Sequence, residues 1–276
     1  MAPSSRREAE AGLRRIGEMR DAEIDLGEAA LLLAALERPG LDLDRYRGHL
    51  AELADAVAKA GADSAEARAA ALAGALAGRY GYAGDDETYD DLQNANLARV
   101  IDRRRGLPVS LGILYIQTGR AQGWTVEGLN FPAHFLVRLG DGTGRAILDP
   151  FHRGAARSAA DLRALLKSSS GVGAELIPEH TAPLGNRAVL LRLQHNIKLR
   201  QMRADRVDQA IATLEAMLLF APQEALLWRE AGLLHAHVDN VTAAIAALER
   251  FLALSADARL RHHTALLLQR LRTRLN

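Results

Sequence analysis

The chain has 276 residues, of which 49% are hydrophobic and 25% charged, and its formal net charge is +1. This composition is ordinary for one or two compact units, and the balanced charge argues against bulk nucleic acid as a partner. The chain holds no cysteine, which excludes disulfides, thiolate metal sites and a cysteine nucleophile. We recognise no targeting segment, and no apolar run reaches the roughly 18 residues that a membrane span needs. We therefore expect a cytoplasmic protein that binds neither nucleic acid nor a membrane.

Helical patterns fill the first third of the chain. Residues 1–20 predict a polar lead-in, either frayed or a short polar helix. Between Asp42 and Lys59 apolar residues recur every three or four positions, which predicts an amphipathic helix. Asp63, with Glu66 three residues later, predicts a capping box at the start of an alanine-rich helix that reaches Ala77.

Two further helices precede a change of periodicity. Residues 92–104 form the first, and Pro108 opens the second, because proline is well tolerated in a first helical turn. Three short runs of large or β-branched residues follow, and Asp141-Gly142 predicts a hairpin turn between the second and third. These predicted strands are residues 125–129, 134–139 and 146–148. Helices followed by a small antiparallel sheet predict an α+β fold.

The last third of the chain predicts helices with an internal repeat. Ser168–Gly173 is the best linker candidate before it. Ala210, Leu214 and Leu218 recur as Ala244, Leu248 and Leu252, each 34 residues later. That period is typical of tetratricopeptide repeats, helical hairpins that bury their apolar faces by stacking.

Four motifs between residues 96 and 151 carry a resemblance to a known family. They resemble the SirB-type branch of the transglutaminase-like proteins, which also carries two C-terminal repeats. The resemblance spans about residues 20–270. The motifs are Asn96-x-x-x-Val100-x-x-Arg103-Arg104, Gly106-Leu107-Pro108-Val109-Ser110-Leu111, Pro132-Ala133-His134-Phe135-Leu136-Val137-Arg138 and Leu148-Asp149-Pro150-Phe151.

The resemblance implies a transglutaminase-like, cysteine-protease-like core of helices and an antiparallel sheet, with a helical N-terminal segment and C-terminal tetratricopeptide-like hairpins. We expect the lead-in at residues 1–20 and the core at residues 21–167. A linker at residues 168–185 and the helical repeats at residues 186–276 complete the expected organisation.

The resemblance also implies a Cys-His-Asp triad, in which the cysteine starts a helix. His134 and Asp149 match the His and Asp positions, whereas an ungapped reading places Pro108 where the cysteine belongs. Ser110 is the only hydroxyl close by. Two residues along a helix rotate a side chain by about 200°, so Ser110 points nearly opposite to a group at position 108. The alternative to a nucleophilic Ser110 is a local hydrogen bond to backbone.

We expect His134 and Asp149 to contact each other, either as the remnant of a catalytic dyad or as a structural pair. His152 lies near enough in sequence to leave a metal site conceivable, but its spacing is not diagnostic. We expect no metal and no cofactor.

Arginines gather at the end of the predicted helix 92–104. They are Arg99, Arg103, Arg104 and Arg105. One interpretation is a solvated face that pairs with the carboxylates of residues 85–91, and the other is a site for phosphate or an acidic partner.

Two hypotheses for function follow. The preferred one is a non-catalytic regulatory protein, which binds a protein or peptide partner through its repeats; the oligomeric state stays open. The alternative is a hydrolase or acyltransferase acting on amide or thioester bonds, with Ser110 as nucleophile, His134 as base and Asp149 as the orienting group. The proline at position 108 favours the first.

Overall fold

The computed structural model describes residues 5–140, 142 and 144–275. The chain forms two compact units. One holds Met1–Ala9 and Arg20–Leu193, and the other holds Glu10–Met19 and Gln194–Asn276. No helix in the described part of the chain has the length and apolar character to cross a membrane.

Most α-helices of the first unit start where a short polar side chain caps them. Asp42, for example, accepts hydrogen bonds from the backbone N–H groups of Asp44 at 3.2 Å and Arg45 at 3.4 Å, which confirms the predicted start of the helix there. The helices of this unit are α2 (Leu26–Glu37), α3 (Leu43–Ala58), α4 (Ala65–Ala73), α5 (Leu97–Arg103), α6 (Pro108–Arg120) and α7 (Ala159–Ser170), with the short η1 (Asp21–Glu23), η3 (Leu92–Asn94) and η4 (Pro178–Thr181).

The start of α4 differs from the predicted capping box. Ser64, not Asp63, is the cap: it has extended backbone angles, and its hydroxyl accepts a hydrogen bond from the N–H of Ala67 at 3.1 Å. Aspartate and serine are both good N-cap residues, and a serine one residue later can bind the free N–H groups of the first turn equally well. The helix therefore begins after Ser64 and not after Asp63. The helix then continues as a π-helical segment, η2 (Gly74–Arg79), which extends past Ala77, where we expected the helix to end.

The core sheet has the strand order β6-β5-β4-β3-β7, with every pair antiparallel. Its strands are β3 (Thr125–Leu129), β4 (Leu136–Gly140), β5 (Arg145–Asp149), β6 (Ala155–Ala156) and β7 (Pro183–Leu184). The three predicted strands and the α+β fold are confirmed. Of the predicted turn, Asp141 lies outside the described residues. A separate parallel pair joins β1 (Ala83–Gly84) to β2 (Arg105–Gly106).

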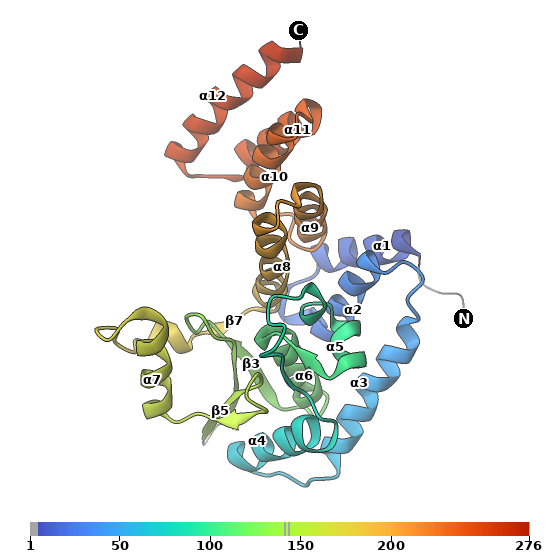
Figure 1. Cartoon of the computed structure of the whole chain (residues 1–276), viewed down its shortest axis with the longest axis vertical. Helices are drawn as coiled ribbons and strands as arrows, with labels where there is room; N and C mark the ends of the chain where they lie inside the picture. Colours follow the sequence, from blue (N-terminus) through green and yellow to red (C-terminus); the bar gives the residue numbers. More distant parts are fainter. Residues whose placement is uncertain (1–4, 141, 143, 276) are drawn as a thin grey trace. The chain divides into compact units, whose positions relative to one another are not determined.

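Helices cover both faces of this sheet (Figure 1). On one face α6 approaches closely: a Cβ on Gly112 would overlap the ring of Phe135, so the absent side chain lets helix and sheet meet. On the other face α7 packs Leu162 and Leu166 against Leu129 and Leu136. The residues before β4 and after β5, where the motifs place His134 and Asp149, therefore lie at the edge of a tightly packed layer.

The serine-rich segment lies within the first unit. Ser158 and Asp161 form a capping box at the start of α7, and Ser168–Ser170 are its last turn. The two units instead divide after Leu193, inside the continuous helix α8 (Asn186–Arg203). The division thus falls later than the linker that we expected at residues 168–185. Leu162 and Leu166 account for this, since their burial holds α7 on the sheet.

The second unit consists of the C-terminal part of α8 followed by the stacked helices α9 to α12 (Figure 1). After α8 come α9 (Val207–Phe220), α10 (Ala225–His237), α11 (Val241–Leu254) and α12 (Ala258–Leu275). A Cβ on Gly232 of α10 would lie 2.5 Å from the side chain of Leu248 on α11, so this glycine permits the tight hairpin. Part of α1 (Arg6–Glu18) also belongs to this unit, with Leu13 and Ile16 buried; the polar lead-in is a helix with one apolar face.

Candidate functional site

Ser110 lies in the first turn of α6, where Pro108 is the first helical residue. Its side chain is fully buried, at 0% exposure. The hydroxyl donates to the backbone carbonyl of Asn94 at 2.7 Å or of Leu107 at 2.9 Å. A hydroxyl has one proton to donate, and both of these neighbours are acceptors. Ser110 therefore fastens α6 to the segment before α5, as the local-backbone interpretation predicts.

His134 lies in the loop that leads into β4, after Ala133 with its left-handed backbone (φ 57°). Arg192 holds this loop by donating to the carbonyls of His134 at 2.5 Å and Phe131 at 3.2 Å. The imidazole is half-buried. Burial lowers the pKa of His134 below its ordinary value, while the negative charge of Asp149 opposes that shift. The ring is consequently neutral at pH 7.

Asp149 ends β5 and is buried, at 2% exposure. Its Oδ2 lies 2.8 Å from Nδ1 of His152 and accepts hydrogen bonds from the guanidinium of Arg157 at 2.7 and 3.2 Å. The backbone N–H of His152 donates to Oδ1 at 3.3 Å. A buried carboxylate is thus satisfied by a cation and a local imidazole.

The structure does not bring the three expected site residues together by hydrogen bonds. Among the described residues, none joins His134 to Asp149, and none joins Ser110 to either. The contact that we expected at His134 is made by His152. Bringing Asp149 together with His152, three residues away in the same turn, costs less chain entropy than bringing it together with His134, which is more distant in sequence. The imidazole of His152 is half exposed. Its position three residues after Asp149 is the one sequence signal for this pairing.

The surroundings of His152 contain no cluster of metal ligands among the described residues. Within residues 5–140, 142 and 144–275, no group of three or more His, Asp or Glu side chains converges as metal ligands do. His152 offers Nε2 alone, since its other nitrogen faces Asp149.

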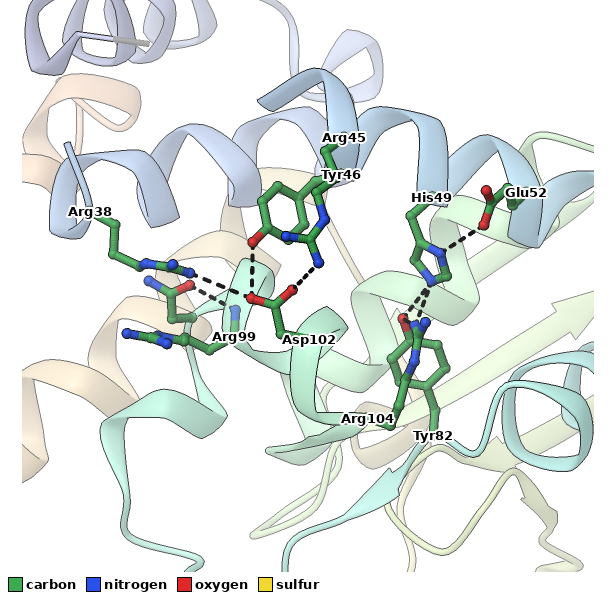
Figure 2. Close-up of polar contacts among 10 residues, drawn as sticks. Arg38, Arg45, Tyr46, His49, Glu52, Tyr82, Arg99, Asp102 and Arg104 are labelled. Carbon is green, nitrogen blue, oxygen red and sulfur yellow. Dashed lines mark hydrogen bonds and ion pairs between the residues drawn. The ribbon is translucent and has the colours of Figure 1, made fainter. Parts of the chain in front are cut away.

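A second polar cluster joins α3 to α5 (Figure 2). Asp102 accepts hydrogen bonds from the hydroxyl of Tyr46 at 3.0 Å and from Arg45 at 3.1 Å. Arg38 completes the group, with an ion pair to Asp102 at 3.7 Å. One carboxylate thus binds three residues from two places in the chain and fixes α5 on the first helices.

His49 lies one turn further along α3 (Figure 2). Its Nδ1 faces Glu52 at 3.1 Å, and its Nε2 lies 2.8 Å from the hydroxyl of Tyr82 and 2.6 Å from Nη1 of Arg104. Arginine can only donate, so Nε2 accepts from Arg104 and we infer that the proton is on Nδ1. Burial and the positive charge of Arg104 lower the pKa of His49.

The arginine cluster divides between these environments. Arg103 forms the predicted pair with an upstream carboxylate, at 2.8 Å from Asp85. The pairing holds Asp85 charged, and its pKa falls to about 2, because hydrogen bonds from Thr88 and Arg103 outweigh its burial. Arg104 instead contacts His49 and Tyr82. Sequence reasoning found the arginines but missed His49 and Tyr82, which lie on separate elements 33 residues apart.

Comparison with known proteins adds the family. A model of the transglutaminase-like superfamily matches residues 44–195, and a tetratricopeptide-repeat model matches residues 197–269. A UPF0162 protein of Xylella fastidiosa is 29% identical over 239 residues, which cover 85% of each chain. A UPF0162 protein of Vibrio cholerae is 32% identical over 174 residues, or 63% of this chain and 64% of that protein.

Among solved structures, the crystal structure of menin, which reveals its binding site for the Mixed Lineage Leukemia protein, aligns with 95% of this chain and 74% of the menin chain. The identity is 11% and the TM-score 0.43, too low for a shared fold to follow. The first family model alone matches more than half of the chain, and the repeat model follows it directly. The chain therefore belongs to the transglutaminase-like superfamily, as a SirB-type member with C-terminal tetratricopeptide repeats.

Proposed function

We propose that this protein is a non-catalytic, regulatory member of its superfamily that binds a protein or peptide partner through the repeats. One observation carries the proposal. Pro108 occupies the position that the family resemblance assigns to the cysteine, and the nearest hydroxyl, Ser110, is buried on two backbone carbonyls. Proline offers no nucleophilic atom, and a serine held this way has no base within hydrogen-bond distance among the described residues.

The repeat helices support the binding half of the proposal. Most exposed large apolar residues of the two hairpins lie on their first helices: Leu199 and Met202 on α8, and Leu226 and Leu233 on α10; Val238 lies in the turn after α10. Within the described residues of α9 and α11, none is exposed to this degree. Exposed apolar side chains gathered on one class of helix are typical of a binding face.

The arrangement follows the repeat period. Leu199, Leu233 and Leu267 occupy equivalent positions, 34 residues apart. Leu199 is 49% exposed and Leu233 38% exposed, whereas Leu267 is partly buried. An ion pair between the buried Lys198 and the partly exposed Glu230, at 2.5 Å, ties α8 to α10 beside these leucines. The face is thus a regular one, suited to a peptide that carries several large apolar side chains.

A peptide selection on the intact protein tests this proposal. Peptides selected from a random displayed library should be enriched in leucine, isoleucine and phenylalanine. Because hot-spot residues at an interface contribute more than 1 kcal/mol each, Leu233→Asp should weaken an enriched peptide by about tenfold.

Val172→Asp is the matched control, since Val172 is 90% exposed and lies in the other unit. It should leave the affinity unchanged, and circular dichroism should find both variants folded. Absence of any enriched peptide, or equal affinity of Leu233→Asp and wild type, would remove the support for binding through this face.

A further inference from the structure

Arg104 adopts a backbone conformation that its residue type disfavours. It caps α5 with φ 59° and ψ 23°, the left-handed region where glycine is the usual residue. The conformation turns the side chain towards α3, where the guanidinium lies 4.7 Å from the centroid of the Tyr82 ring and 2.6 Å from Nε2 of His49 (Figure 2). Strained residues of this kind gather at functional sites.

Two more arginines join Arg104 around the segment 79–82. Arg79 lies 5.4 Å from the centroid of the Tyr80 ring, and Arg104 lies 5.8 Å from the same ring. Arg105 donates to the carbonyls of Gly81 and Arg104, each at 3.1 Å. The pairing of β1 with β2 fixes Arg105 beside Ala83, so these positions rest on regular structure.

None of these three guanidiniums pairs with a carboxylate of the described residues. Glu52, the carboxylate bonded within the cluster, faces Nδ1 of His49. The neighbouring arginines differ, since Arg103 pairs with Asp85 and Arg45 with Asp102. Three like charges held together repel each other, and an anion from outside would offset that repulsion.

We propose that Arg79, Arg104 and Arg105 form a docking site for an acidic peptide segment of a partner protein. Guanidinium groups bind carboxylates through paired, charge-assisted hydrogen bonds. Arg79 and Arg105 are exposed and face solvent, while Arg104 is half-buried and anchors the group. The site lies in the first unit and is separate from the leucines of the repeats, so it goes beyond the proposed function.

The surroundings of the Tyr80 ring favour an acidic peptide over a nucleic acid as the bound partner. Single strands bind where aromatic rings are free to stack on bases. The Tyr80 ring is already covered by Arg79, Arg104 and the edge of His49, whose centroid is 5.6 Å away. A cluster of charges without an available ring fits carboxylates better than bases.

Fluorescence anisotropy with the intact protein tests the proposal. The probe is a fluorescein-labelled decapeptide of glutamate, measured at low ionic strength because surface charges are screened by salt. Wild type should bind it, and Arg79→Glu and Arg105→Glu should each weaken binding by about tenfold. Leu233→Asp should bind as wild type does, which separates this site from the repeat face.

Arg163→Glu is the matched control: Arg163 is exposed on α7 and has no carboxylate partner among the described residues. It changes the net charge equally and should alter the affinity by less than about twofold. Equal loss in Arg163→Glu would reduce the effect to net charge and overturn the proposal. So would the absence of binding to wild type, or tighter binding of a phosphate ion or a thymidine oligonucleotide than of the peptide.

Discussion

The carboxylate of Asp149 lies 2.8 Å from Nδ1 of His152, the imidazole three residues further along the same turn. The family arrangement would direct this carboxylate to His134 instead. The guanidinium of Arg157 also donates hydrogen bonds to Oδ2 of Asp149. Asp149 therefore has a structural role at the end of β5. It acts on His134 through the electrostatic attraction of its charge and not through a hydrogen bond.

Removing that charge should destabilise the first unit. Asp149→Asn leaves Arg157 without its carboxylate, and breaking a mostly buried pair in this way lowers the free energy of unfolding by about 2–4 kcal/mol. His152→Ala should lower it by less than about 1 kcal/mol, since its ring is half exposed. Urea unfolding of both variants measures the difference. Equal effects of the two would mean that His152, not Arg157, is the partner that matters.

A substitution of Tyr115 should increase the stability of the protein. The Tyr115 hydroxyl is buried and has no hydrogen-bond partner among the described residues, and burial raises its pKa. An unsatisfied buried hydroxyl costs about 1–3 kcal/mol, so Tyr115→Phe should raise the free energy of unfolding by about 1 kcal/mol. Thermal and urea unfolding report the change. A loss of stability instead would show that the hydroxyl is bonded in solution.

His49 predicts a dependence of stability on pH. Its pKa is lowered in the folded protein from the ordinary 6.5, mainly by burial and by Arg104. The unfolded chain therefore binds a proton at this ring more readily than the folded protein does. Stability contributed by the neutral ring is present above pH 6.5 and is lost as the pH falls towards the folded value.

Titration of the His49 ring by nuclear magnetic resonance checks this directly and should give a midpoint below 6.5. His49→Asn should flatten the loss of stability between neutral pH and the folded midpoint. A midpoint above the ordinary value would mean that Glu52, rather than Arg104 and burial, dominates the environment of His49.

Much of the fold was predictable because its signals are local. Pro108 at the first position of α6 and the 34-residue period from Ala210 to Ala244 each specify structure within a short window. The cap of α4 was missed by one residue, because Asp63 and Ser64 are both competent caps. The sequence predicts a linker at the serine-rich end of α7, whereas buried Leu162 and Leu166 hold this helix on the sheet.

The partners within the site were less predictable. Which imidazole meets Asp149 depends on the turn after β5, and the sequence motifs predict His134, whereas the structure has His152. The contact of His49 with Tyr82 and Arg104 depends on how α3 packs beside α5. Such contacts arise from tertiary packing between segments far apart in sequence, which local patterns do not encode.

The central proposal, that this member of the superfamily is non-catalytic, is tested most directly by covalent labelling. Wild type and His134→Ala would be treated with a fluorophosphonate probe and examined by mass spectrometry of the intact protein and its peptides. We predict no adduct on Ser110 under conditions that fully label a known serine hydrolase, because its hydroxyl is buried on the carbonyls of Asn94 and Leu107. Stoichiometric modification of Ser110 in wild type, lost in His134→Ala, would contradict the account.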